Sequence, residues 1–172
     1  VTAERTTSAG NGAIMRLAPV VIAGFRSRSP REVVATARLS ARETHYSVEA
    51  EAATEVFAAL LVGALLGWSP EQLMDVSWAS TGQPFDEMAA RVISPDPRVR
   101  ASWEAETSGY IVNGLRLAVH GLLDFPSFKD ATLAIANMGG DSDTNAAIYG
   151  QLGGAFYGIE AIPASWRERV YQ

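Results

Sequence analysis

The spacing of apolar and polar positions along this 172-residue chain predicts helices almost throughout. Apolar residues recur every three to four positions, which places them on one face of an α-helix. No stretch of any length shows the strict alternation of a half-buried strand. The expected helices cover residues 13–25, 33–41, 47–67, 71–79, 85–92, 110–123, 127–138, 144–158 and 163–171. We therefore expect one all-α domain over residues 1–172.

Local signals mark where several of these helices begin and end. The runs S-P-R-E at 29–32 and S-P-E-Q at 69–72 each offer a capping serine, a proline in the first turn and an acid or amide three residues after the serine. The helix expected from Ser47 is acidic at its start and then becomes continuously apolar, so we expect its second half to be buried all round. The run S-P-D-P at 94–97 predicts a loop.

Composition excludes several classes of protein. A net charge of −5, with scattered arginines, argues against binding to a nucleic-acid backbone. The chain has no cysteine, so disulfides and thiolate metal sites are excluded. The longest apolar run, 56–68, is shorter than the roughly 20 residues that span a membrane. The first residues are polar and lack the apolar core of a secretory signal. We expect a cytoplasmic location and no membrane partner.

The run G-G-D-S-D-T at 139–144 is the strongest candidate for a chemical site. At a helix entrance, the oxygens of Asp141, Asp143 and Thr144 can converge, and the positive end of the helix supports their charge. Such hard oxygen ligands suit Mg²⁺, Mn²⁺ or Ca²⁺. Taken alone, the four residues 141–144 favour plain capping of the helix by Asp141 or Ser142 over a metal site.

Two further explanations of this region fail. An EF-hand requires a glycine where Ala146 stands and a glutamate where Leu152 stands. A membrane helix packed through glycines at every fourth position, 150 to 158, is excluded because the segment is too short and is bounded by Asp143 and Glu160. We interpret these glycines as allowing neighbouring helices to approach closely.

Two other segments are individually weak signals. The glycine-rich loop at 7–12, which runs into a helix, can present backbone N–H groups to an anion such as phosphate, although an ordinary turn explains it equally well. His45 stands at the junction of two helices, where a histidine is usually a capping residue. We interpret His120, on an apolar helix, as structural.

Taken together and in order, these motifs resemble one family. They are G-N-G-A-I-M-R at 10–16, T-H at 44–45, S-G-Y-I-V at 108–112, the long run from 139 to 158, and I-P at 162–163 with a following tryptophan. This resembles the ADP-ribosylglycohydrolase family, which includes the dinitrogenase reductase-activating glycohydrolases and the ADP-ribosyl-acceptor hydrolases. The resemblance covers the chain from Ser8 to Trp166.

The resemblance implies an all-α orthogonal bundle that holds two divalent metals, Mg²⁺ or Mn²⁺. The expected metal ligands in this chain are Asp141, Asp143 and Thr144. The expected substrate-binding residues are Ser8, Gly10, Asn11 and Gly12, beside the phosphates of ADP-ribose, and His45. The implied reaction is metal-dependent hydrolysis of the N- or O-glycosidic bond of an ADP-ribosylated protein or small molecule, which releases ADP-ribose. The alternatives are a non-catalytic ADP-ribose-binding module and a structural protein that reuses the fold.

The chain also departs from the family pattern. Members carry an earlier acidic cluster, with G-D-x-x-G and D-D-T motifs, that supplies the remaining metal ligands and, in several members, the catalytic carboxylate. This chain has neither motif, so we expect it to be the C-terminal portion of the fold, completed by preceding sequence or by a second chain. We predict no catalytic residue within it and no hydrolysis by the segment alone. Ala9 stands where some members have an aromatic residue, so the acceptor is not identified.

Overall fold

A computed structural model describes residues 9–170, and within that range the fold is all-α, as expected. Its only β feature there is an isolated bridge between Gly10 and Tyr110. The ten α-helices are α1 (Ala18–Phe25), α2 (Pro30–Ala41), α3 (Val48–Leu65), α4 (Pro70–Met74), α5 (Gln83–Val92), α6 (Pro97–Ser102), α7 (Ile111–Asp124), α8 (Phe128–Ala136), α9 (Ser142–Tyr157) and α10 (Ala164–Val170). The short 3₁₀ helices are η1 (Asn11–Ala13), η2 (Ser77–Ala79), η3 (Trp103–Ala105) and η4 (Ile159–Ala161).

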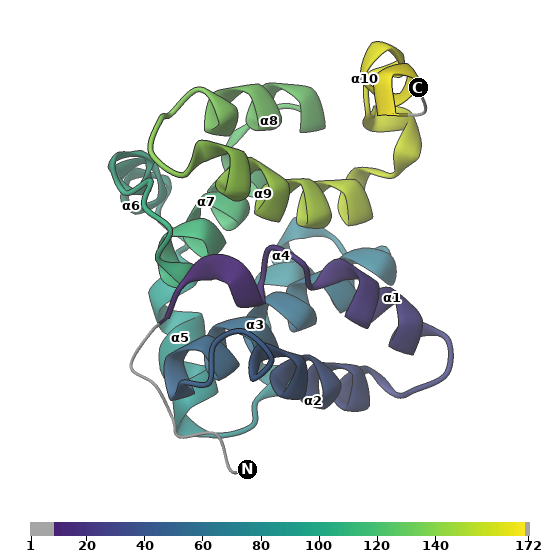
Figure 1. The fold of residues 1–172 in the computed structure, drawn as a ribbon, viewed down its shortest axis with the longest axis vertical. Helices are drawn as coiled ribbons and strands as arrows, with labels where there is room; N and C mark the ends of the chain where they lie inside the picture. The colour runs from purple at the N-terminus through teal and green to yellow at the C-terminus, as the bar shows by residue number, and fades with distance from the viewer. Residues whose placement is uncertain (1–8, 171–172) are drawn as a thin grey trace.

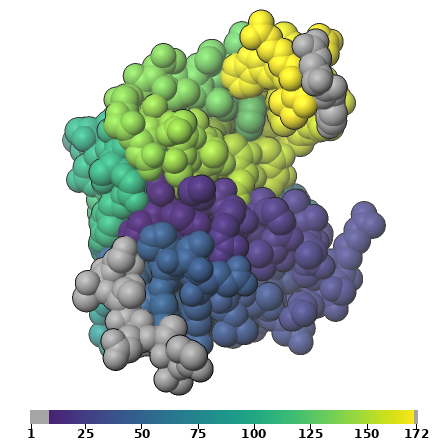
Figure 2. All heavy atoms as spheres, viewed as in Figure 1, coloured from purple at the N-terminus to yellow at the C-terminus, as the bar shows by residue number. Residues whose placement is uncertain are grey.

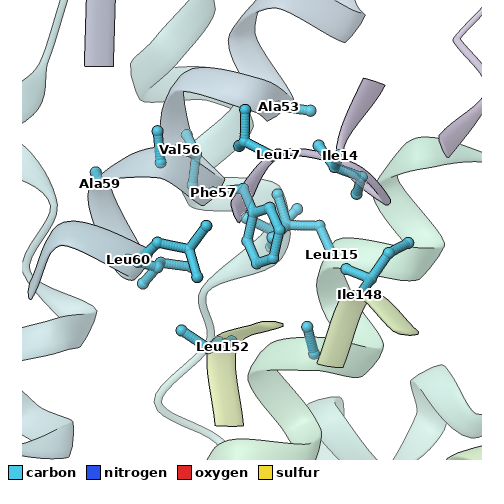
Figure 3. Packing of buried hydrophobic residues seen from close by; sticks show 14 of the residues in the cluster. Ile14, Leu17, Ala53, Val56, Phe57, Ala59, Leu60, Leu115, Ile148 and Leu152 are labelled. Atoms are coloured by element: carbon cyan, nitrogen blue, oxygen red, sulfur yellow. The ribbon is translucent and has the colours of Figure 1, made fainter. Parts of the chain in front are cut away.

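Helix α3 lies at the centre of the molecule (Figure 1), in contact with α1, α2, α5, α7 and α9. Every residue from 50 to 64 is buried, which confirms the expectation that its second half is surrounded. Phe57 and Leu60 of α3 meet apolar side chains from α7, α9 and the η1 segment, as Figure 3 shows. Truncating a fully buried phenylalanine such as Phe57 costs about 3–5 kcal/mol.

The predicted capping signals form as expected. Ser29 and Glu32 make a capping box at the start of α2, and Ser69 and Gln72 make a second one at α4. Ser47 caps α3 by accepting a hydrogen bond from the backbone N–H of Ala50. These bonds satisfy amide groups that a helix start leaves without partners.

Two expected helices are divided in the structure. The apolar run 13–25 forms η1, a turn and then α1, because Pro19 in the first turn of α1 has no N–H to continue a preceding helix. The run 71–79 forms α4 and η2, because the Asp75 carboxylate accepts hydrogen bonds from the N–H and hydroxyl of Ser77 instead. The expected loop at 94–97 is shorter than predicted, since Pro97 begins α6 after the Asp96 cap.

Helix α9 is joined to the amino-terminal segment by Gln151. Its side-chain carbonyl accepts a hydrogen bond from the Ala18 N–H at 2.7 Å, and its amide donates to the Ile14 carbonyl at 2.9 Å. The first bond satisfies a free donor at the start of α1. In the space-filling view the η1–α1 segment accordingly lies directly beside α9 (Figure 2). Across residues 9–170, no helix is long and apolar enough to cross a membrane.

Candidate functional site

Three segments far apart in the sequence are joined by backbone hydrogen bonds. They are the glycine loop (residues 10–12), the turn before α7 (residues 107–110), and the start of α9. The Asn11 N–H donates to the Gly109 carbonyl at 2.9 Å, and the Ile111 N–H donates to the Ala9 carbonyl at 2.9 Å. The Asp141 N–H donates to the Thr107 carbonyl at 2.8 Å. The turn therefore holds the glycine loop on one side and α9 on the other.

The carboxylate of Asp141 faces the glycine loop. Its Oδ2 accepts a hydrogen bond from the Asn11 side-chain amide at 2.6 Å, across 130 positions of sequence. Asp141 stands at the cap position of α9, yet its side chain makes no capping hydrogen bond. Capping by Asp141 therefore does not explain this residue, and its charge lies beside the expected phosphate-binding loop.

Asp143 and Thr144 lie in the first turn of α9. The Asp143 Oδ1 accepts a hydrogen bond from the Thr144 N–H at 2.9 Å, and Asp143 is exposed while Thr144 is partly buried. The two carboxylates and the hydroxyl are oxygen groups of the kind that bind Mg²⁺ or Mn²⁺. They remain predicted ligands. Among residues 9–170, no group of three or more histidine, aspartate or glutamate side chains is placed to hold a metal ion.

Both glycines before Asp141 adopt a left-handed backbone, and Gly140 also makes a close backbone contact. Gly139 and Gly140 have φ values of 80° and 63°, in the left-handed region. A Cβ atom at Gly140 would stand 2.4 Å from the hydroxyl of Thr107 and 2.6 Å from its backbone carbonyl. Glycine at 140 therefore allows the turn to approach α9 closely enough to accept the Asp141 hydrogen bond.

His45 packs against the glycine loop, and its expected role in substrate binding remains a prediction. A Cβ atom at Gly10 would stand 2.6 Å from its Nε2, and one at Gly12 would stand 2.9 Å from its Cε1. The Nδ1 atom is buried and has no hydrogen-bond partner within the described residues. The structure thus brings together Gly10, Asn11, Gly12, His45 and Asp141. Ser8 lies outside the described residues.

His120 is held by other side chains, as the structural interpretation requires. Its Nδ1 lies 2.7 Å from Asp124, and its Nε2 lies 2.9 Å from Glu104. Asp124 also accepts two hydrogen bonds from Arg100, each of 2.6 Å. Burial acts to raise the pKa of Asp124, but the hydrogen bonds from Arg100 and His120 outweigh it and hold that pKa below its usual value.

Sequence reasoning missed a second cluster at the same turn. The Tyr110 hydroxyl donates to Glu49 and accepts a hydrogen bond from Arg91 Nη2 at 2.7 Å. Burial acts to raise the pKa of Glu49, but the hydrogen bonds from Tyr110 and Arg91 outweigh it and lower that pKa. Burial and the bond to Glu49 raise the pKa of Tyr110. The S-G-Y motif was the available signal, although it identifies neither partner.

Comparison with known proteins identifies the family of this chain. The family model described as ADP-ribosylglycohydrolase matches residues 2–172, and the chain therefore belongs to the ADP-ribosylglycohydrolase family. This confirms the resemblance and places the chain in a family of hydrolases. A solved structure described as an ADP-ribosylglycohydrolase-related protein complex superposes with a TM-score of 0.77 at 38% identity, over 93% of this chain and 54% of that one.

Two curated relatives are both ADP-ribosylarginine hydrolases named Tri1. The protein from Serratia proteamaculans is 30% identical over 165 residues, and that from Pseudomonas putida is 32% identical over 172 residues. The matches cover 96% and 95% of this chain but 43% of each relative. The chain therefore spans less than half the length of these relatives. An ADP-ribosyl-[dinitrogen reductase] glycohydrolase from Rhodospirillum rubrum is 34% identical over 68 residues.

Proposed function

We propose that this chain forms the part of an ADP-ribosylglycohydrolase that carries the phosphate-binding loop and half of a dinuclear Mg²⁺ or Mn²⁺ site. The reaction is hydrolysis of the glycosidic bond of ADP-ribosylated substrates, with release of ADP-ribose. The observation that carries the proposal is the hydrogen bond between Asn11 and Asp141, which places a carboxylate beside the glycine loop. The ADP-ribosylarginine hydrolases among its relatives suggest arginine as the acceptor.

The charge at this site supports a metal. An ADP-ribose diphosphate on the glycine loop would lie close to the Asp141 carboxylate, and two anions in contact repel each other strongly in a partly buried site. Asp141, Asp143 and Thr144 would hold a divalent cation, whose positive charge would offset that repulsion. When bound, the metal would hold ribose hydroxyls and the attacking water. The side chain of Asn11 donates a hydrogen bond to the Asp141 carboxylate, and His45 packs against the glycine loop.

The outward face of α9 supports completion of the site by another part of the family fold. Asp143, Ala147, Gly150 and Gly154 follow one another at helical spacing, and a Cβ atom at either glycine would meet nothing within 4 Å. Glycine within a helix costs about 1 kcal/mol relative to alanine, so a closely packed neighbour is the physical reason to keep it.

This face continues into a hollow between α9 and α1. The hollow has a volume of about 270 Å³ and mostly apolar walls, and Ile22 at its edge is 62% exposed. We propose that the remaining part of the family fold, whether in the same polypeptide or in a second chain, packs on this face. A segment lying along α9 reaches Asp143 at the helix start, where it would supply the remaining metal ligands.

A specific observation favours a second candidate function. Because residues 9–170 assemble no group of three acidic or histidine side chains for a metal, the chain by itself is better suited to bind ADP-ribose than to cleave it. Non-catalytic binding of ADP-ribose is therefore the alternative.

Release of ADP-ribose from ADP-ribosylated arginine separates the two functions. The protein as its gene encodes it, together with any partner chain that co-purifies, should release ADP-ribose with Mg²⁺ or Mn²⁺ and not with EDTA. Asp141→Asn should abolish release, whereas Asp86→Asn, an exposed carboxylate on α5, should not affect it. Release of ADP-ribose by the 172-residue chain alone would contradict the proposal that the chain holds only half of the metal site. Binding without release by the encoded protein would favour the alternative.

A further inference from the structure

Three polar side chains fasten the turn before α7 to two other helices. Arg91, in the last turn of α5, contacts Glu49, in the first turn of α3, with 2.6 Å between Nη1 and Oε1. The Tyr110 hydroxyl lies between them and hydrogen-bonds to both side chains. We call this group the Glu49–Arg91–Tyr110 clasp.

The clasp bears on the candidate site through the backbone of its tyrosine. Tyr110 is the residue directly opposite Gly10 in the isolated bridge. The same turn supplies the Gly109 carbonyl that accepts from Asn11 and the Thr107 carbonyl that accepts from Asp141. A shift of Tyr110 therefore moves the backbone acceptors of both the glycine loop and the start of α9.

Stability alone is a poor reason for this arrangement. The side chains of Arg91 and Glu49 are 42% and 31% exposed, and ion pairs at such positions contribute little to folding. Glu49 and Arg91 instead fix the orientation of the Tyr110 side chain, because each makes a charge-assisted hydrogen bond to its hydroxyl from a different side. The arginine is itself held, since Arg116 donates to the Arg91 carbonyl at 2.9 Å.

We propose that Glu49 and Arg91 are positioning residues for ADP-ribose binding, acting through Tyr110 to set the distance between the glycine loop and Asp141. This rests on the proposed function, in which those two segments contact the diphosphate and the metal. Neither Glu49 nor Arg91 needs to touch the ligand.

The test is a double-mutant cycle on ADP-ribose affinity, measured by calorimetry with Mg²⁺ present. Glu49→Gln, Arg91→Gln and Tyr110→Phe should each weaken binding about tenfold, the usual consequence of losing one charge-assisted hydrogen bond. The double variant Glu49→Gln/Arg91→Gln should be no weaker than either single variant, because the three groups act as one unit. Glu87→Gln and Arg98→Gln, exposed residues on α5 and α6, are the matched controls and should bind as the unaltered chain does.

Amide hydrogen exchange in the ligand-free chain separates positioning from general destabilisation. The clasp variants should speed exchange at the Asn11 and Asp141 N–H groups and leave the amides of α8 unchanged. Equal acceleration in α8 would mean that the clasp only stabilises the fold, and this would overturn the proposal. Unchanged affinity in all three variants would overturn it while leaving the proposed function intact. Failure of the unaltered chain to bind ADP-ribose would remove the phosphate-loop assignment, and the positioning role with it.

Discussion

Replacing Gly140 by alanine tests whether the close approach of the turn to α9 builds the site. Two costs can be worked from the structure. The positive φ of 63° costs an alanine about 1–2 kcal/mol. The added Cβ would also stand 2.6 Å from the Thr107 backbone carbonyl, which cannot rotate away, and relieving such overpacking costs about 1–3 kcal/mol. The free energy of unfolding should therefore fall by about 2–5 kcal/mol.

Gly139→Ala is the matched control for this prediction. Gly139 also has a positive φ, of 80°, but a Cβ atom there would meet nothing within 4 Å, so only the conformational cost of about 1–2 kcal/mol applies. Urea unfolding of the two variants gives the difference directly. ADP-ribose affinity should also fall more in Gly140→Ala, since the Thr107 carbonyl that binds Asp141 must move. Equal unfolding free energies and affinities for the two variants would refute the reasoning.

Three further changes should be measurable in the 172-residue chain. Burial raises the pKa of Glu55. The protonated carboxyl therefore stabilises the folded chain, and this stabilisation is lost as pH rises through the folded pKa. Glu55→Gln should accordingly raise the thermal midpoint at pH 8 more than at pH 4. Arg100→Gln removes the two hydrogen bonds that Asp124, whose side chain is 17% exposed, accepts from the guanidinium, and should cost about 1–3 kcal/mol in urea unfolding. Because the pKa of Asp124 is lowered, its contribution is present above the unfolded pKa and is lost as pH falls through the folded pKa, so this cost should shrink in acid. Gly154→Ala should stabilise the chain by up to about 1 kcal/mol, because the added methyl meets nothing.

Each of these has a clear contrary result. An equal shift for Glu55→Gln at both pH values would mean that its charge is not the cause. If Arg100→Gln lowers the free energy of unfolding by less than about 1 kcal/mol, the pair between Arg100 and Asp124 contributes no more than a solvent-exposed ion pair. Destabilisation by Gly154→Ala would mean that part of the described chain already covers this face of α9.

The parts of the fold that could be predicted are those whose signals come from residues close together in the sequence. The capping boxes at Ser29 and Ser69 and the buried α3 were predicted because their signals lie within a few residues of one another. The two divided helices were not predicted, because the spacing of apolar residues carries no information about backbone hydrogen bonds. Pro19 lacks an N–H, and the Asp75 carboxylate competes with the helix backbone for hydrogen bonds.

The candidate site was predictable only in part, for a similar reason. Motif order indicated that the glycine loop and Asp141 belong together, but their contact spans 130 positions and depends on the intervening turn. The clasp could not be predicted from the sequence, since Glu49 and Tyr110 are separated by 61 positions and the S-G-Y motif identifies neither partner of the tyrosine. The metal-binding roles of Asp143 and Thr144 remain predictions.

We propose that ADP-ribose and a divalent metal bind next to each other at Asp141 and the glycine loop. Calorimetric titration of the protein as its gene encodes it, together with any partner chain that co-purifies, tests it most directly, with ADP-ribose added in Mg²⁺ and again in EDTA. Binding should be tighter in Mg²⁺, and that difference should be lost in Asp141→Asn but not in Asp86→Asn. The same dissociation constant with and without Mg²⁺, or a metal effect that survives Asp141→Asn, would contradict it.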